Sequence, residues 1–494
     1  MSTTDIPKPA GRKPVSPLSA DEQPLYVDRT EIYQQSIWGF FRQTKWIVLV
    51  ATLAVYYLLP FVRWYRGPDR PDQAVLIDFP NSKFYFFFVE IWPQEFYVLT
   101  GLLILAAFTL FLMNAVAGRV WCGYLCPQTV WTDLFQAVER WIEGDRRERM
   151  KLHAQPFGFD RAWRLGAKHT IWILIAWWTG GAWVLYFADA PTLVWELLTF
   201  QAPQIAYIAI AVLTFTTYAF AGLMREQVCQ YMCPWPRIQA AMTDQHAYNV
   251  TYIEGRGEPR MSLKQSQLAR SAGQPAGDCV DCKQCVVVCP TGIDIRDGMQ
   301  LGCIQCGLCI DACDGVMAKV GRPSGLVAYE TQANIDARAC GQPPVSKIIR
   351  PRTLLYVGLI AIVGLMILFS LGTRAFTTIA SLHDRDPLYV RLADGGVRNA
   401  YTIRIVNKRP NGRIFTVSVE GFPRLQATAI GALPTQSEWP MIEVPADSTR
   451  EVRLLVTAPP GAWRPGSTEI VVRAVELGTG EIATTRDNFI APGG

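Results

Sequence analysis

The hydrophobic positions of the chain are concentrated in five long runs that contain no charged residue. The runs cover Trp46–Val62, Phe96–Gly118, Thr170–Ala188, Leu197–Met224 and Thr353–Thr373. A membrane core about 30 Å thick needs roughly 20 helical residues to cross it, so the runs have the length of membrane spans. Buried helices of a soluble protein would instead carry polar residues at helical spacing on one face. The pattern therefore predicts five transmembrane helices.

The charged residues between these runs predict the orientation of the helices. The segment between the second and third runs is rich in Lys and Arg, whereas the segment between the third and fourth has none. Because basic loops stay in the cytoplasm, that basic segment, the N-terminus and residues 221–352 are expected inside, and the tail after Gly372 outside. All 13 cysteines precede residue 341, on the side expected to be reducing. The net charge of +5 reflects this topology and gives no argument for nucleic-acid binding.

Eight of the cysteines form two runs with the same spacing, CVDCKQCVVVCP and CIQCGLCIDAC. The spacing C-x2-C-x2-C-x3-C binds [4Fe–4S] clusters, and in two-cluster ferredoxins the fourth Cys of each run ligates the other cluster. Structural zinc instead favours CxxC pairs that are separated by a longer loop. The sequence therefore predicts two [4Fe–4S] clusters, one bound by Cys279, Cys282, Cys285 and Cys313, and the other bound by Cys303, Cys306, Cys309 and Cys289.

A second cysteine motif occurs twice, each time at the cytoplasmic end of an apolar run. WCGYLCPQ and VCQYMCPWP both read C-x3-C-P, both have Tyr at the second intervening position, and an arginine, Arg119 or Arg225, precedes each. If the helix continues through the motif, Cys122 and Cys126 share one face, as do Cys229 and Cys233. The duplication predicts four soft ligands around one volume.

Several occupants of that volume are open on the residues alone. Thiolates select Cu(I), zinc and iron–sulfur clusters, and nearby methionines could add thioether ligands that favour copper. A third iron–sulfur cluster, structural zinc, or plain packing thiols are the alternatives. The methionines are Met113, Met224, Met232 and Met242.

The C-terminal part of the chain has a different periodicity. From about Asp384, short alternating segments such as YTIRIVNK and RIFTVSVEG predict an antiparallel immunoglobulin-like sandwich, which could dock a partner or cap the last helix. The fold class is a multi-domain membrane protein with a five-helix transmembrane bundle, a cytoplasmic dicluster ferredoxin-like α+β insert and an all-β C-terminal domain. The expected segments are a disordered cytoplasmic tail without a signal peptide (1–35), helices 1–4 (36–250), the ferredoxin-like domain (251–345), helix 5 (346–375) and the sandwich (384–494).

The apolar runs, the duplicated CxxxCP, the dicluster insert and the β-rich tail together resemble the cytochrome c oxidase accessory protein family called FixG or CcoG. The resemblance covers almost the whole chain. It implies a multi-pass cupric reductase of the bacterial inner membrane that reduces Cu(II) to Cu(I) for assembly of a haem–copper oxidase, with a periplasmic C-terminal domain. It also implies a cytoplasmic electron donor, and oxidase assembly factors or a copper chaperone as partners. The residues that would act on copper are Cys122, Cys126, Cys229 and Cys233.

Two other functions fit the same motifs. A quinone-linked membrane ferredoxin relay would need a quinone pocket, for which no sequence signature exists. A non-catalytic oxidase assembly scaffold would have structural clusters that do not change their redox state.

Overall fold

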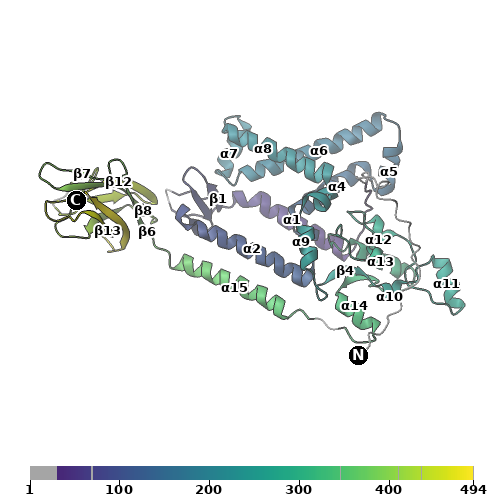
Figure 1. Cartoon of the computed structure of the whole chain (residues 1–494). Helices are drawn as coiled ribbons and strands as arrows, with labels where there is room; N and C mark the ends of the chain where they lie inside the picture. Colours follow the sequence, from purple (N-terminus) through teal and green to yellow (C-terminus); the bar gives the residue numbers. More distant parts are fainter. Residues whose placement is uncertain (1–30, 68–69, 345–346, 410, 435–436, 493–494) are drawn as a thin grey trace, which may run out of the picture. The chain divides into compact units, whose positions relative to one another are not determined.

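The structure of the protein is a computed structural model that describes residues 31–67, 70–344, 347–409, 411–434 and 437–492. Residues 1–30 of the expected disordered tail lie outside the described residues. The chain divides into two compact units, one formed by 1–64 with 73–360 and the other by 65–72 with 361–494 (Figure 1). The first unit contains all 13 cysteines.

Four helices among the described residues are long and apolar enough to cross a membrane. They are α1 with its 3-10 extension (Phe40–Phe61), α2 (Phe96–Ala117), α8 with the π-helical segment η3 (Gln204–Met224), and α15 (Pro351–Gly372). The expected span Thr170–Ala188 falls mostly within α6 (Phe159–Val184). Helix α6 is not one of the four, since it is rich in tryptophan and its first turns are polar. The number of spans, five, therefore stays a prediction.

The shorter helices connect these long ones. Helices α6 and α8 pack against each other and α4 packs on α6 (Figure 1). Helix α1 begins next to the ferredoxin-like elements, and helix α2 ends next to them. The connecting helices are α3 (Val120–Tyr124), α4 (Pro127–Glu143), α5 (Arg146–Ala154), α7 (Ala190–Leu198), η4 (Val228–Met232) and α9 (Trp235–Met242). A three-stranded antiparallel sheet of β1 (Val75–Asp78), β2 (Lys83–Phe86) and β3 (Val89–Ile91) lies between α1 and α2 in sequence.

The ferredoxin-like part is built on an antiparallel strand pair and short helices. Strands β4 (Asn249–Tyr252) and β5 (Val327–Glu330) enclose both cysteine runs in sequence, with Tyr252 opposite Val327. Their buried side chains pack with Cys279 and Cys285 in one core. The helices are α10 (Glu254–Gly257), α11 (Leu263–Ser271), α12 (Gln284–Val287), α13 (Leu308–Lys319) and α14 (Gln332–Ala339).

The second unit contains an antiparallel sandwich. One sheet has the strand order β10-β12-β8-β6 with β7 paired to β8, and the other has the order β11-β9-β13-β14. Tyr401, Phe415 and Phe489 are fully buried in its core, as the alternating pattern predicts. The first strand begins at Thr377, before the expected boundary at residue 384. The strands are β6 (Thr377–His383), β7 (Val390–Arg391), β8 (Val397–Asn407), β9 (Arg413–Glu420), β10 (Gln426–Ala429), β11 (Met441–Val444), β12 (Ser448–Ala458), β13 (Gly466–Glu476) and β14 (Ile482–Ala491).

A buried group of charges connects the helices of the first unit. Glu139 on α4 accepts a hydrogen bond at 2.7 Å from Arg225, the residue just after η3. Glu139 also pairs with Arg149 of α5 at 2.9 Å. Lys168 of α6 pairs with Glu143 at 2.6 Å and with Glu139 at 3.5 Å. Burial alone would raise the pKa of Glu139, but Arg225 and Arg149 outweigh burial and hold that pKa below its usual value. The carboxylate therefore stays charged and fixes the start of the second CxxxCP motif.

We expect Glu139→Gln to destabilise the protein by about 3–5 kcal/mol, because it leaves buried cations without a carboxylate. Thermal unfolding of the purified protein in detergent measures this change. Asp160→Asn is the matched control, since Asp160 forms an exposed pair with Arg164 on one helix face, and such pairs contribute less than about 1 kcal/mol. Equal losses in the two variants would contradict a structural role of the buried group.

Candidate metal centre

The two CxxxCP motifs have the same local backbone. The residue four positions before the first cysteine has a positive φ in both, 54° at Gly118 and 48° at Arg225. In both, the N–H of the second cysteine donates to the carbonyl of the residue just before the first, at 2.9 Å from Cys126 to Trp121 and at 2.8 Å from Cys233 to Val228. The duplication in sequence is thus a duplication of one turn.

The helix does not continue through either motif, so the condition under which each cysteine pair would share one helix face is not met. Helix α3 ends at Tyr124, and Cys126 is extended with ψ of 127°. Cys233 is likewise extended, with ψ of 123°, directly after η4. The reason is the proline that follows each second cysteine, since its ring disfavours helical ψ in the residue before it.

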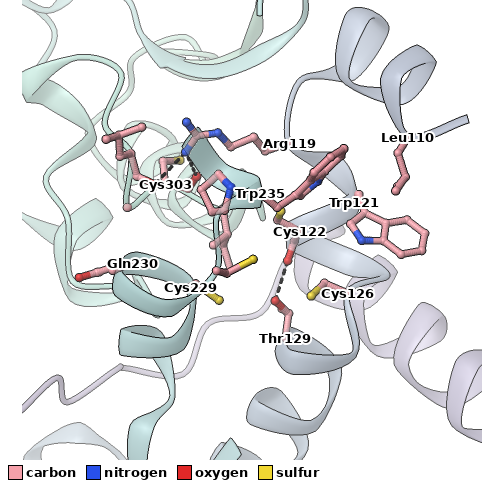
Figure 2. Close-up of a pocket in the computed structure, with 15 residues that line it drawn as sticks. Leu110, Arg119, Trp121, Cys122, Cys126, Thr129, Cys229, Gln230, Trp235 and Cys303 are labelled. Atoms are coloured by element: carbon pink, nitrogen blue, oxygen red, sulfur yellow. Dashed lines mark hydrogen bonds between the residues drawn. The ribbon is translucent and has the colours of Figure 1, made fainter. Parts of the chain in front are cut away.

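The turns nevertheless bring the four cysteines together. Cys122, Cys126, Cys229 and Cys233 all line one cavity of about 200 Å³. Figure 2 shows Cys122 and Cys126 of the first turn and Cys229 of the second around the same space. Cys303 of the second ferredoxin run lines this cavity as well. The candidate metal centre is therefore formed by two turns and one ferredoxin loop.

The cavity wall is mainly apolar and keeps the thiols away from water. Trp121 and Trp235 contribute to it, and burial raises the pKa of Cys122 and of Cys229 to about 12. These thiols hold their protons at neutral pH unless a metal ion displaces them. The Cys122 thiol donates to Gln239 at 3.2 Å.

The sulfur atoms are not arranged around a single point. Among the described residues, no group of three or more His, Cys, Asp or Glu side chains is close enough to hold one metal ion. None of the four methionines proposed as thioether ligands lines the cavity. A single ion would therefore need the thiols to move closer together, whereas a larger polynuclear centre holds its ligands further apart.

The second ferredoxin run forms a cavity of its own. Cys303, Cys306 and Cys309 line a small cavity together with Cys289 and Cys285 of the first run. The crossed pattern requires Cys289, the last cysteine of the first run, to lie with these three residues. Cys306 is buried and the other three predicted ligands are partly buried, and a set of thiols such as this fits an iron–sulfur cluster. The ligand assignment stays a prediction.

The other four predicted cluster ligands also lie near one another. Burial, together with the nearby Cys285 and Cys282, raises the pKa of Cys313 to about 12. Cys279 and Cys285 are buried, whereas Cys282 is exposed. The last cysteine of the second run thus lies with the first run, and these residues also fit a cluster.

The first CxxxCP turn packs directly on the second ferredoxin run. A side chain at Gly123 would meet the Ile304 carbonyl oxygen at 2.8 Å and the Cys306 Cα at 3.2 Å. The Tyr124 hydroxyl donates to the Cys306 carbonyl at 2.9 Å. These residues were not predicted as part of the site. The Tyr that both motifs share could have indicated a role for Tyr124. The need for glycine at position 123 could not be predicted, because it depends on the backbone of a distant loop.

The fold and the site define a membrane-associated iron–sulfur oxidoreductase. Residues 224–332 match a family model described as a 4Fe-4S dicluster domain, and residues 98–146 match a 4Fe-4S binding domain. Residues 367–492 match the IG-like fold at the C-terminus of FixG. The chain is 46% identical to the nitrogen fixation protein FixG of Rhizobium meliloti, over 95% of this chain and 94% of that protein. It is 48% identical to protein RdxA of Cereibacter sphaeroides, over 89% and 92% of the two chains. The chain belongs to the FixG family.

We expect Cys289→Ser to remove the cluster predicted at Cys303, Cys306 and Cys309, although Cys289 lies in the first run. Two clusters amount to about eight irons per chain, so the variant should lose about four. Iron analysis and EPR of anaerobically purified protein measure both effects.

Two further variants control this test. Cys282→Ser should remove the other cluster signal, and Cys340→Ser should remove neither, because Cys340 is an exposed thiol outside both groups. If Cys289→Ser and Cys282→Ser abolish the same signal, the crossed ligation is wrong.

Proposed function

We propose that the protein reduces Cu(II) to Cu(I) at the four-thiol cavity. The observation that carries this proposal is that Cys122, Cys126, Cys229 and Cys233 line one cavity together with Cys303, a predicted cluster ligand. The iron–sulfur clusters, when bound, supply one-electron transfer. A reductant in the cytoplasm is the source of the electron, and each Cu(II) consumes one.

The cysteines of the cavity favour the product of this reaction. Thiolates are soft ligands and hold Cu(I) more strongly than Cu(II), so a copper ion at this site is easier to reduce than in water. Each buried thiol must give up its proton to the solvent when copper binds. The apolar wall around Trp121 and Trp235 limits access of water to the bound ion.

The proposed biological role follows from the family. We propose that the Cu(I) product serves assembly of a haem–copper cytochrome oxidase, with an assembly factor or a copper chaperone as the acceptor. The membrane arrangement proposed for this role has five spans, with α6 as the third, both cysteine motifs and the ferredoxin-like part on the cytoplasmic side, and the sandwich in the periplasm. The positions of the basic residues and the absence of cysteine after residue 340 support it.

A third iron–sulfur cluster in the four-thiol cavity is the second candidate. The match of residues 98–146 to a 4Fe-4S binding domain includes Cys122 and Cys126. The spacing of the thiols, which does not suit a single ion, also favours it. In that case the protein would be an electron-transfer relay with an acceptor other than copper.

Replacing Cys122 and Cys126 together by serine should lower bound copper and abolish cupric reduction while leaving the ferredoxin clusters reducible, because hydroxyls are poor ligands for Cu(I). The replacement of Cys229 and Cys233 should have the same effect. Copper and iron analysis, EPR, and the rate of Cu(I) formation by protein that has been reduced with dithionite and freed of it before Cu(II) is added measure these properties.

The matched control is Cys340→Ser, which should keep copper, iron and activity. Cupric reduction at the parental rate in the double-serine variant would exclude this cavity as the copper site. Loss of iron in place of copper would identify the third cluster.

The orientation is tested with a reporter enzyme that is active only after export. Asp394 and Gly273 are both exposed turn residues that follow the membrane helices α15 and α8, so a reporter fused after either residue shows the side to which that helix leads. We expect activity from the fusion after Asp394 and none from the fusion after Gly273. The opposite result would place the cluster cysteines in the oxidising compartment and contradict the proposed arrangement.

A further inference from the structure

Arg119 connects the first CxxxCP turn to the ferredoxin loop that carries Cys303. Its guanidinium donates to the carbonyls of Leu301 at 2.8 Å, Cys303 at 3.2 Å and Gln300 at 3.4 Å. Its backbone N–H donates to the side chain of Gln305 at 2.7 Å. Arg119 is only 4% exposed and lines the four-thiol cavity. One residue therefore holds the loop before Cys303 through its guanidinium and after Cys303 through its backbone N–H.

Arg119 has no arginine counterpart on the second turn. The two residues with positive φ, Gly118 and Arg225, occupy the same place in the two turns. This register makes Glu226 the equivalent of Arg119, so the apparent correspondence of the two arginines in sequence is offset by one residue. Arg225 points elsewhere, since it pairs with Glu139 at 2.7 Å.

The charge of Arg119 has no carboxylate partner among the described residues. Only carbonyl oxygens and the Gln305 amide accept from it. A buried cation is costly unless a negative group compensates for it. The thiols of Cys303 and Cys122 interact electrostatically with Arg119. Metal-bound thiolates at these positions would supply the missing negative charge.

Arg296, the arginine beside the cluster cysteines of the first run, does have carboxylate partners. Arg296 interacts with Cys285, but it is paired with Asp281 and Asp294, both at 2.6 Å. Its positive charge is therefore neutralised locally. Lys45, which interacts with Cys306, lies 3.8 Å from the carboxylate of Asp133, which it shares with Arg42 at 2.8 Å.

We propose that Arg119 is a positioning residue that fixes the Cys303 loop against the four-thiol cavity and raises the reduction potential of the cluster bound by Cys289, Cys303, Cys306 and Cys309. A nearby uncompensated positive charge stabilises the reduced, more negative form of a cluster, and net charge is one of the factors that set cluster potentials. The inference rests on the proposed cluster ligation but not on copper reduction.

The test is a potentiometric titration of the full-length protein, purified anaerobically without copper, in which EPR follows each cluster. Cys289→Ser identifies the signal of the Cys303 cluster. Arg119→Gln should shift the midpoint of that signal to lower potential and leave the other unchanged. Arg296→Gln is the matched control and should shift the other signal to lower potential, because it leaves Asp281 and Asp294 unpaired.

Arg119→Lys separates charge from position. Lysine keeps the charge but cannot donate to several carbonyls in a fixed fork, so its midpoint should stay closer to the parental value than that of Arg119→Gln. An unchanged midpoint in Arg119→Gln, or a shift of only the other cluster, would overturn the proposal. A shift in Arg119→Lys as large as in Arg119→Gln would overturn the charge effect. If the Arg119→Gln protein does not retain this cluster, the test rests on the midpoint potential of the Arg119→Lys protein. A midpoint clearly below the parental value would then overturn the proposal. Because no copper is present, failure of cupric reduction would leave these outcomes unaffected.

Discussion

The contact between Gly123 and the backbone of residues 304–306 is the constraint on which the metal centre depends. Gly123 lies between Cys122 and Cys126, and residues 304–306 belong to the loop that begins at Cys303. No side chain fits between the two loops, because a Cβ at position 123 would lie 2.8 Å from a carbonyl oxygen. Two cysteine-bearing loops are therefore held together by backbone packing, which varies less than contacts between long side chains.

The prolines of the two motifs complete this arrangement. Each proline disfavours helical geometry in the cysteine before it, so the helix ends between the two thiols of a motif. A continuous helix would instead place both thiols on one face. The turn instead allows α4 and α9 to leave in new directions while Cys126 and Cys233 stay at the cavity.

Much of this organisation could be predicted from the sequence, because it depends on hydrophobic runs and on the spacing of cysteines. Apolar runs, the two C-x2-C-x2-C-x3-C runs and the repeated C-x3-C-P each restrict the local structure strongly. The register of Arg119 and Arg225 could not be predicted, since positive φ at Arg225 is rare for a residue that is not glycine. The methionines were expected near the copper because they are close in sequence, but adjacent residues in a turn point in different directions. The interruption of the helix was foreseeable from the prolines, whose effect on the preceding cysteine outweighs helical periodicity.

The two halves of the cavity are anchored to different parts of the first unit. The first turn is tied to the ferredoxin loop by Arg119, and the second is tied to α4 through the pair between Arg225 and Glu139. Both arginines are largely buried, with Arg119 4% exposed and the Arg225 side chain 11% exposed. Both contacts oppose movement of the turns, because breaking a buried contact of a charged group is costly. This restraint bears on what the cavity can hold, because a single ion would need the thiols to move closer together, whereas a larger polynuclear centre would not.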